Sequence, residues 1–149
     1  MAFEVPRSCI SEVSDPPRCQ DCISEDASGS LFRFLSGLGG VSLRAFGSHA
    51  WQHLTGLPYV TPGSDIDLLA FIDSKEAWLR LRSALDRVEW PARPRIDLEV
   101  VLGRDASFLW REFVAARDDR LLFKGNARIW MGSKNDVSRL LRDSVREPG

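Results

Sequence analysis

The sequence predicts an α/β (α+β) domain in which helices flank a small mixed sheet. The chain has 149 residues and 44% of them are hydrophobic, so one domain with a packed core is expected rather than a disordered chain. From residue 29 onward, segments with helical spacing of apolar residues alternate with short strand-like segments. This alternation favours a sheet that is covered by helices.

Residues 1–28 are predicted to form an irregular arm, and residues 29–149 the folded domain. The arm is rich in proline, serine and acidic residues and has no apolar run. It holds all three cysteines of the chain, which are Cys9, Cys19 and Cys22. Their role stays open at this point.

The Cys-Gln-Asp-Cys spacing of Cys19 and Cys22 is one that binds zinc or takes part in redox chemistry. His49 and His53 lie four residues apart, so a Cys2His2 zinc site is one interpretation. The other interpretation is that the thiols stay reduced in a poorly ordered arm. It is favoured because the histidines fall beside a different motif.

The first part of the domain is expected to hold two helices around a short strand. Leucines at helical spacing predict a helix at 29–38, which a pair of glycines ends. A short strand at 43–46 then runs into a Gly-Ser pair, and a second helix follows at 49–54.

The middle of the chain carries the clearest patterns. Residues 55–64 contain two glycines and two prolines and are predicted to form a loop. Residues 65–72 become almost wholly apolar, which is typical of a central strand buried on both faces. The next helix is capped by Asp73 or Ser74, and its apolar residues recur at helical spacing as far as Val88.

The last part of the chain is expected to contain three strands and two helices. Residues 95–102 alternate between apolar and acidic residues, as in a strand with one buried face. Asp105 is the predicted cap of a helix at 106–116. Two short strands and a last helix follow, at 121–124, 127–131 and 135–146.

The most informative residues are three aspartates on two of the predicted strands. Asp65 and Asp67 lie one residue apart, so their side chains share a face, and Asp97 stands on the following strand. Carboxylate oxygens are the ligands that Mg2+ prefers. Gly47 allows a phosphate to approach the backbone and Ser48 adds a hydroxyl donor. These residues predict a site for a divalent metal and the phosphates of a nucleotide.

Charge and hydropathy exclude several classes of protein. The formal net charge of -1 argues against a protein that coats nucleic acid. No segment reaches the apolar length of a membrane span, and the N-terminus does not read as a signal peptide. We therefore expect a cytoplasmic protein with neither a nucleic acid nor a membrane as its partner.

These motifs resemble the nucleotidyltransferase superfamily, whose fold is polymerase-β-like and whose signature is Gly-Ser, a spacer, Asp-x-Asp and a later aspartate. Within it, the chain looks like malonate decarboxylase holo-acyl-carrier-protein synthase, also called phosphoribosyl-dephospho-CoA transferase. The resemblance covers about residues 31–133 and is carried by four segments: Arg44–Leu69, Arg95–Glu99, Trp110–Glu112 and Leu121–Lys124.

The resemblance implies a nucleotidyltransferase-like mixed sheet and a specific reaction. A phosphoribosyl-dephospho-CoA group would pass from triphosphoribosyl-dephospho-CoA to a serine of an acyl carrier protein, and pyrophosphate would leave. Two Mg2+ ions would be held by Asp65, Asp67 and Asp97. By the same resemblance, Asp97 would act as general base or hold the metal on the side of the nucleophile.

The resemblance also implies which residues contact phosphate. Gly47 and Ser48 would bind the leaving phosphates, and Arg111 and Lys124 would add further phosphate contacts. Leu98 departs from the family pattern, in which a glycine is expected.

Two other functions remain open from the sequence. One is a small nucleotidyltransferase that uses ATP or another nucleoside triphosphate to modify a protein or a small molecule. The other is a catalytically inactive domain that binds a nucleotide without turnover.

Overall fold

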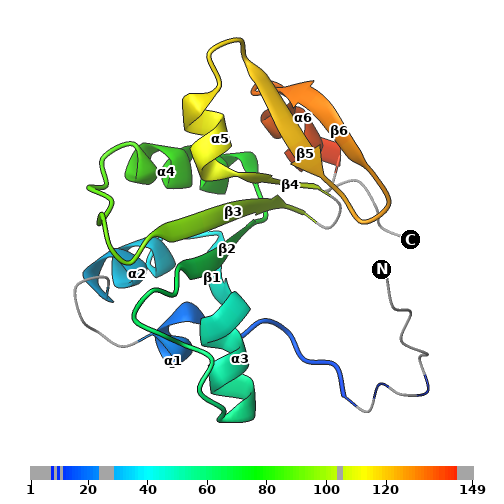
Figure 1. Cartoon of the computed structure of the whole chain (residues 1–149). Coiled ribbons are helices and arrows are strands. Elements are labelled where there is room, and N and C mark those ends of the chain that lie inside the picture. The colour runs from blue at the N-terminus through cyan, green and yellow to red at the C-terminus, as the bar shows by residue number, and fades with distance from the viewer. Residues whose placement is uncertain (1–7, 9, 11, 24–28, 104–105, 144–149) are drawn as a thin grey trace.

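A six-stranded mixed sheet with helices packed against it forms the protein, as the sequence predicts (Figure 1). The computed structural model describes residues 8, 10, 12–23, 29–103 and 106–143. The strands lie side by side in chain order and are β1 (Val41–Phe46), β2 (Ile66–Ile72), β3 (Ile96–Leu102), β4 (Ala106–Leu109), β5 (Arg120–Lys124) and β6 (Ile129–Ser133). The helices are α1 (Cys19–Cys22), α2 (Gly29–Ser36), α3 (Gly47–Thr55), α4 (Lys75–Leu85), α5 (Trp110–Ala115) and α6 (Asp136–Asp143).

The strand pair β2–β3 is parallel, and every other neighbouring pair is antiparallel. A parallel pair needs a crossover connection, and α4 supplies it. The Ser74 hydroxyl accepts a hydrogen bond from the Ala77 amide at 3.2 Å, so Ser74 caps α4. The helix ends at Leu85, three residues before the predicted end at Val88.

Only one face of β2 is fully buried, which corrects the prediction of a strand buried on both faces. Burial alternates strictly along the strand. Ile66, Leu68 and Ala70 are buried, whereas Asp67 and Leu69 are half-buried on the opposite face. The apolar residues at 69 and 71 concealed this alternation in the sequence, because both faces carry aliphatic or aromatic side chains beyond Asp67.

The predicted helix at 106–116 is wrong in its first half. Residues Ala106–Leu109 form β4, which pairs antiparallel with β3, and only Trp110–Ala115 is helical. Burial alternates along β4, and Phe108 is completely buried. The predicted cap, Asp105, lies outside the described residues.

Aromatic side chains join the helices to the buried face of the sheet. The Trp78 ring of α4 meets the Phe108 ring of β4 edge to face, with 5.8 Å between centroids. It also meets the Phe113 ring of α5 at 5.4 Å. This cluster fixes α4 and α5 against β4, on the side of the sheet away from Asp67.

Part of the segment expected to be irregular is ordered against β1. The Ala45 amide donates to the Pro17 carbonyl at 2.8 Å, and Arg18 pairs with Arg44 in an isolated antiparallel bridge. The Cys19 side chain in α1 has 0% exposure. A buried thiol behaves as a small hydrophobic group, so Cys19 anchors this segment to the core.

None of the helices in the described part of the chain has the length and apolar character that a membrane crossing requires.

Candidate active site at the start of β2 and β3

The acidic residues lie at one end of the parallel strand pair. Asp67 of β2 and Asp97 of β3 are direct partners in the strand register, and Asp65 stands immediately before β2. The β2–β3 register therefore brings all three predicted aspartates to the same end of the two strands. Sequence separation alone could not establish this proximity, because it depends on the parallel pairing.

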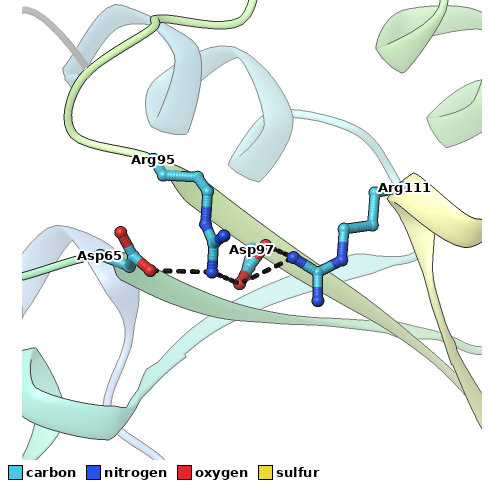
Figure 2. A network of polar contacts seen from close by, with 4 residues as sticks. All are labelled: Asp65, Arg95, Asp97 and Arg111. Carbon is cyan, nitrogen blue, oxygen red and sulfur yellow. Dashed lines mark hydrogen bonds and ion pairs between the residues drawn. The ribbon is translucent and has the colours of Figure 1, made fainter.

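An arginine links two of these carboxylates, as Figure 2 shows. The Arg95 Nη2 atom lies 2.9 Å from Asp65 Oδ2 and 2.8 Å from Asp97 Oδ2. The Arg111 Nη1 atom lies 3.1 Å from Asp97 Oδ1. Asp97 is thus held by two guanidinium groups, that of Arg95 immediately before β3 and that of Arg111 in α5.

Asp67 carries the least compensated negative charge of the three. Partial burial raises the pKa of the Asp67 carboxyl, and the nearby charges of Asp97 and Asp65 raise it further. The charges of His49 and Arg95 oppose this effect. Partial burial also lowers the pKa of His49, which keeps this imidazole neutral over a wider pH range. A cation next to Asp67 would relieve the repulsion among the carboxylates.

Gly47 makes room for the Asp67 carboxylate. Its φ angle of 63° lies in the left-handed region, and a Cβ atom at this position would overlap with Asp67 Oδ2. The sequence predicted that Gly47 admits a phosphate to the backbone. The contact that requires a glycine in this structure is the one with Asp67.

The N-terminus of α3 faces the site without a capping side chain. Phe46 occupies the cap position and makes no side-chain hydrogen bond to the helix. The first amides of a helix lack partners within the helix and favour anions. Ser48, the second residue of α3, is half-buried beside Gly47. This end of α3 is suited to an anionic ligand.

The carboxylates are a donor set suited to Mg2+, but their present arrangement does not form a metal cluster. Among the described residues, no group of three or more His, Cys, Asp or Glu side chains is positioned to hold a metal ion. In this structure Arg95 stands between Asp65 and Asp97. Its side chain is 59% exposed, so it can leave this position without disturbing the core. Metal binding by the three aspartates stays a prediction.

Lys124, predicted to contact phosphate, belongs to a neighbouring polar group on the same face. Its ammonium lies 3.3 Å from Glu99 Oε2. The Ser107 hydroxyl donates to Glu99 Oε1 at 2.5 Å. Glu99 follows Asp97 by two residues on β3, so both side chains point to the same side of the sheet. Sequence reasoning missed Ser107 because its strand was predicted as a helix.

An open cleft of about 660 Å³ adjoins Asp65. Two loops form most of its wall, the segment before β2 and the segment before β3. His49 of α3 also lines it, together with Arg93 and Arg95. The sequence marked 55–64 as a loop but gave no sign that this loop borders a cleft.

The cysteines and histidines do not come together as a zinc site in the described part of the chain. Cys19 and Cys22 are free thiols, and Cys9 lies outside the described residues. Partial burial is the main cause that raises the pKa of the Cys22 thiol to about 11. His49 lines the cleft beside the aspartates instead, while His53 is exposed.

Comparison with known proteins places these residues in a family. The model described as the phosphoribosyl-dephospho-CoA transferase MdcG C-terminal domain matches residues 21–135. A phosphoribosyl-dephospho-CoA transferase of Xanthomonas euvesicatoria is 43% identical over 81 residues, which make up 54% of this chain and 38% of the relative. The enzyme of the same name from Bradyrhizobium diazoefficiens is 33% identical over 126 residues, or 80% of this chain and 55% of the relative.

The chain spans between 38% and 55% of the length of these two relatives. A third, from Xanthomonas campestris, is 34% identical over 102 residues, which make up 68% of this chain and 43% of the relative. No solved structure matches the chain. The matched range contains all three aspartates together with Gly47 and Arg95.

Proposed function

Because the chain belongs to the phosphoribosyl-dephospho-CoA transferase MdcG C-terminal domain family, we propose that it transfers a phosphoribosyl-dephospho-CoA group to a serine of an acyl carrier protein, as in malonate decarboxylase. The donor is the triphosphate precursor, and pyrophosphate is the leaving group. The observation that carries this proposal is the pairing of Asp67 with Asp97 across β2–β3, beside the start of α3.

The proposed reaction is a substitution at phosphorus, of the type that nucleotidyltransferases catalyse. The serine oxygen forms a bond to the phosphorus next to the ribose, and the bond from that phosphorus to the pyrophosphate oxygen breaks. The serine proton passes to a carboxylate oxygen of Asp97. Such a reaction depends on positioning and on neutralising charge.

The residues of the site have two kinds of role: some hold the metal and orient the serine, and others bind the departing phosphates. Asp65, Asp67 and Asp97 would hold Mg2+, which polarises the phosphoryl oxygens and stabilises the leaving pyrophosphate when bound. Asp97 also orients the serine hydroxyl. Support for these roles comes from the pairing of Asp67 with Asp97 at the start of β2 and β3 and from the raised pKa of Asp67, which burial and its acidic neighbours cause.

The departing phosphates would lie at the start of α3. The uncapped amides of this helix, with the Ser48 hydroxyl, supply hydrogen-bond donors. Arg111 adds positive charge, since its side chain is 56% exposed and already reaches the site through Asp97. Lys124 lies on the same face of the sheet, paired with Glu99, and adds a second cation.

A transfer assay with two donors tests the proposal. The protein would be incubated with Mg2+, apo acyl carrier protein and either the labelled triphosphate precursor or labelled ATP. Label is expected on the carrier protein only with the precursor, together with pyrophosphate. Label from ATP alone would indicate an ordinary nucleoside-triphosphate-dependent nucleotidyltransferase. Absence of pyrophosphate with either donor, when a full-length relative is active, would indicate binding without turnover.

A further inference from the structure

Arg95 stands where a cation between Asp65 and Asp97 would stand. A single guanidinium nitrogen, Nη2, contacts Oδ2 of both carboxylates, at 2.9 Å and 2.8 Å. A guanidinium and a metal ion cannot occupy this position together, because both carry positive charge and both need the same two oxygen atoms. The ion pairs of Arg95 and metal binding are therefore mutually exclusive at these atoms.

The arginine is free to leave this position. Its side chain is 59% exposed and that of Asp65 is 40% exposed, so this pair is solvated, whereas the Asp97 side chain is 16% exposed. Exposed ion pairs contribute little to stability, because water already solvates both charges. Asp97 does not lose all its positive neighbours when Arg95 departs, since Arg111 remains 3.1 Å away.

The same arginine also lines the cleft. Arg95 forms part of its wall together with Arg93, His49 and the loop that ends at Asp65. A rotated Arg95 side chain would thus carry its charge into a cleft that already contains one arginine. A planar guanidinium binds phosphate oxygens through two parallel hydrogen bonds.

We infer that Arg95 has two alternative partners. Without metal it links Asp65 to Asp97, and when a divalent cation takes its place it turns into the cleft and contacts the phosphates of the nucleotide substrate. The inference rests on the proposed function, because it assumes that the three aspartates bind the metal. It goes further by giving one side chain two opposite effects on ligand binding.

Replacement of Arg95 by glutamine should reveal both effects. Without nucleotide, the Arg95→Gln variant should bind Mn2+ roughly three- to tenfold more tightly than the unchanged protein, because no guanidinium competes for the carboxylates. With Mg2+ at saturation, the same variant should bind inorganic triphosphate roughly tenfold more weakly, because a charged phosphate contact is lost. A residue with only a structural role would not move the two affinities in opposite directions.

The measurement is a titration of Mn2+ by calorimetry or electron paramagnetic resonance, followed by calorimetry with triphosphate. Arg93→Gln is the matched control, because Arg93 lines the cleft while no ion pair joins it to the three aspartates in the described part of the chain. Its Mn2+ affinity should equal that of the unchanged protein. Arg95→Lys provides a second variant that keeps the charge. Its Mn2+ affinity should fall between that of the unchanged protein and that of Arg95→Gln.

The controls separate two kinds of failure. If Asp67→Asn binds Mn2+ as tightly as the unchanged protein, the aspartates are not the metal site and the proposed function fails. If Asp67→Asn loses Mn2+ affinity but Arg95→Gln does not gain it, the proposed function survives and the role of Arg95 is overturned. Stronger triphosphate binding by Arg95→Gln would overturn that role as well.

Discussion

Asp67 and Asp97 face each other as register partners at the start of the parallel β2–β3 pair. Their neighbours differ. Asp97 accepts contacts from Arg95 and Arg111, whereas Asp67 lies against the backbone of Gly47 and beside His49. One carboxylate is therefore neutralised by side chains, and the other has its pKa raised by burial and by its acidic neighbours.

Replacing Asp67 by asparagine should abolish transfer but stabilise the fold near neutral pH. The raised pKa means that ionised Asp67 opposes folding at high pH. The protonated Asp67 carboxyl favours folding. This contribution to the free energy of unfolding is fully present below the unfolded-state pKa and is lost as pH rises through the folded-state pKa. The variant should therefore melt roughly 1–3 °C higher at pH 7.

Thermal unfolding between pH 3 and pH 8 without metal checks this prediction. The difference between the variant and the unchanged protein should shrink as pH falls toward 3.8, the ordinary value for the carboxyl. Added Mg2+ should raise the melting temperature of the unchanged protein only. A lower melting temperature of the variant at pH 7 would show that ionised Asp67 stabilises the fold.

Three glycine-to-alanine variants should separate backbone strain from the contact with Asp67. Gly47→Ala introduces both a left-handed alanine and an overlap with Asp67 Oδ2. Gly56→Ala introduces only the strain, since its φ is 70° and nothing lies within 4 Å of the added atom. At Gly63 a Cβ atom also meets nothing within that distance, and no left-handed backbone is present.

In denaturant unfolding, the loss in free energy of unfolding should be largest for Gly47→Ala, smaller for Gly56→Ala and smallest for Gly63→Ala. Gly56→Ala should cost about 1 kcal/mol, Gly47→Ala about 2–4 kcal/mol, and Gly63→Ala close to nothing. Gly47→Ala should also lose Mn2+ affinity, because the Asp67 carboxylate must move. Equal losses at positions 47 and 56 would mean that the Asp67 side chain yields without cost.

Lys124→Gln should weaken nucleotide binding while leaving the fold intact. The Lys124 side chain is 41% exposed and that of Glu99 is 18% exposed. Glu99 keeps its hydrogen bond from the Ser107 hydroxyl, so loss of the pair should cost about 1 kcal/mol. The melting temperature should change by less than about 4 °C. The KM for the triphosphate precursor should rise about tenfold, because a charged contact to phosphate is lost.

Lys75→Gln is the matched control for Lys124, since Lys75 is exposed at the start of α4. Its KM should equal that of the unchanged protein. An unchanged KM for Lys124→Gln would leave Lys124 only its ion pair with Glu99.

Cys22 should react slowly with iodoacetamide in the folded protein. Burial and the charge of Asp21 raise the pKa of its thiol to about 11, so little thiolate is present at pH 8. Alkylation at pH 8 should be at least about tenfold slower than in the denatured chain, and should speed up toward pH 11. Mass spectrometry of the digested protein resolves the modified cysteines. Equal rates in folded and denatured protein would contradict the raised pKa.

The sequence was sufficient for the sheet with its helices and for placing Asp67 and Asp97 on strands, because these depend on local patterns. The proximity of the two residues comes from the parallel pairing of β2 with β3, which those patterns do not encode. The β4 strand was missed because its four residues are too few to establish alternation, and the adjoining helix extended the wrong pattern over them. The links from Arg95 to Asp65 and Asp97 depend on strand pairing and on a side-chain conformation, which periodicity does not encode.

Burial of Cys19 was unpredictable for a related reason. The proline-rich sequence around it indicates an irregular backbone, and α1 is only four residues long. The order of this segment comes from hydrogen bonds to β1 and from packing in the core, which are contacts between residues far apart in the sequence.

The proposed function requires that Asp65, Asp67 and Asp97 share a divalent cation. The most direct test is a crystal structure of the protein grown with Mn2+, with anomalous scattering recorded to locate the metal. We expect a manganese peak about 2 Å from oxygen atoms of these aspartates, with Arg95 turned away from Asp65. Manganese bound elsewhere, with Arg95 still between Asp65 and Asp97, would contradict this expectation.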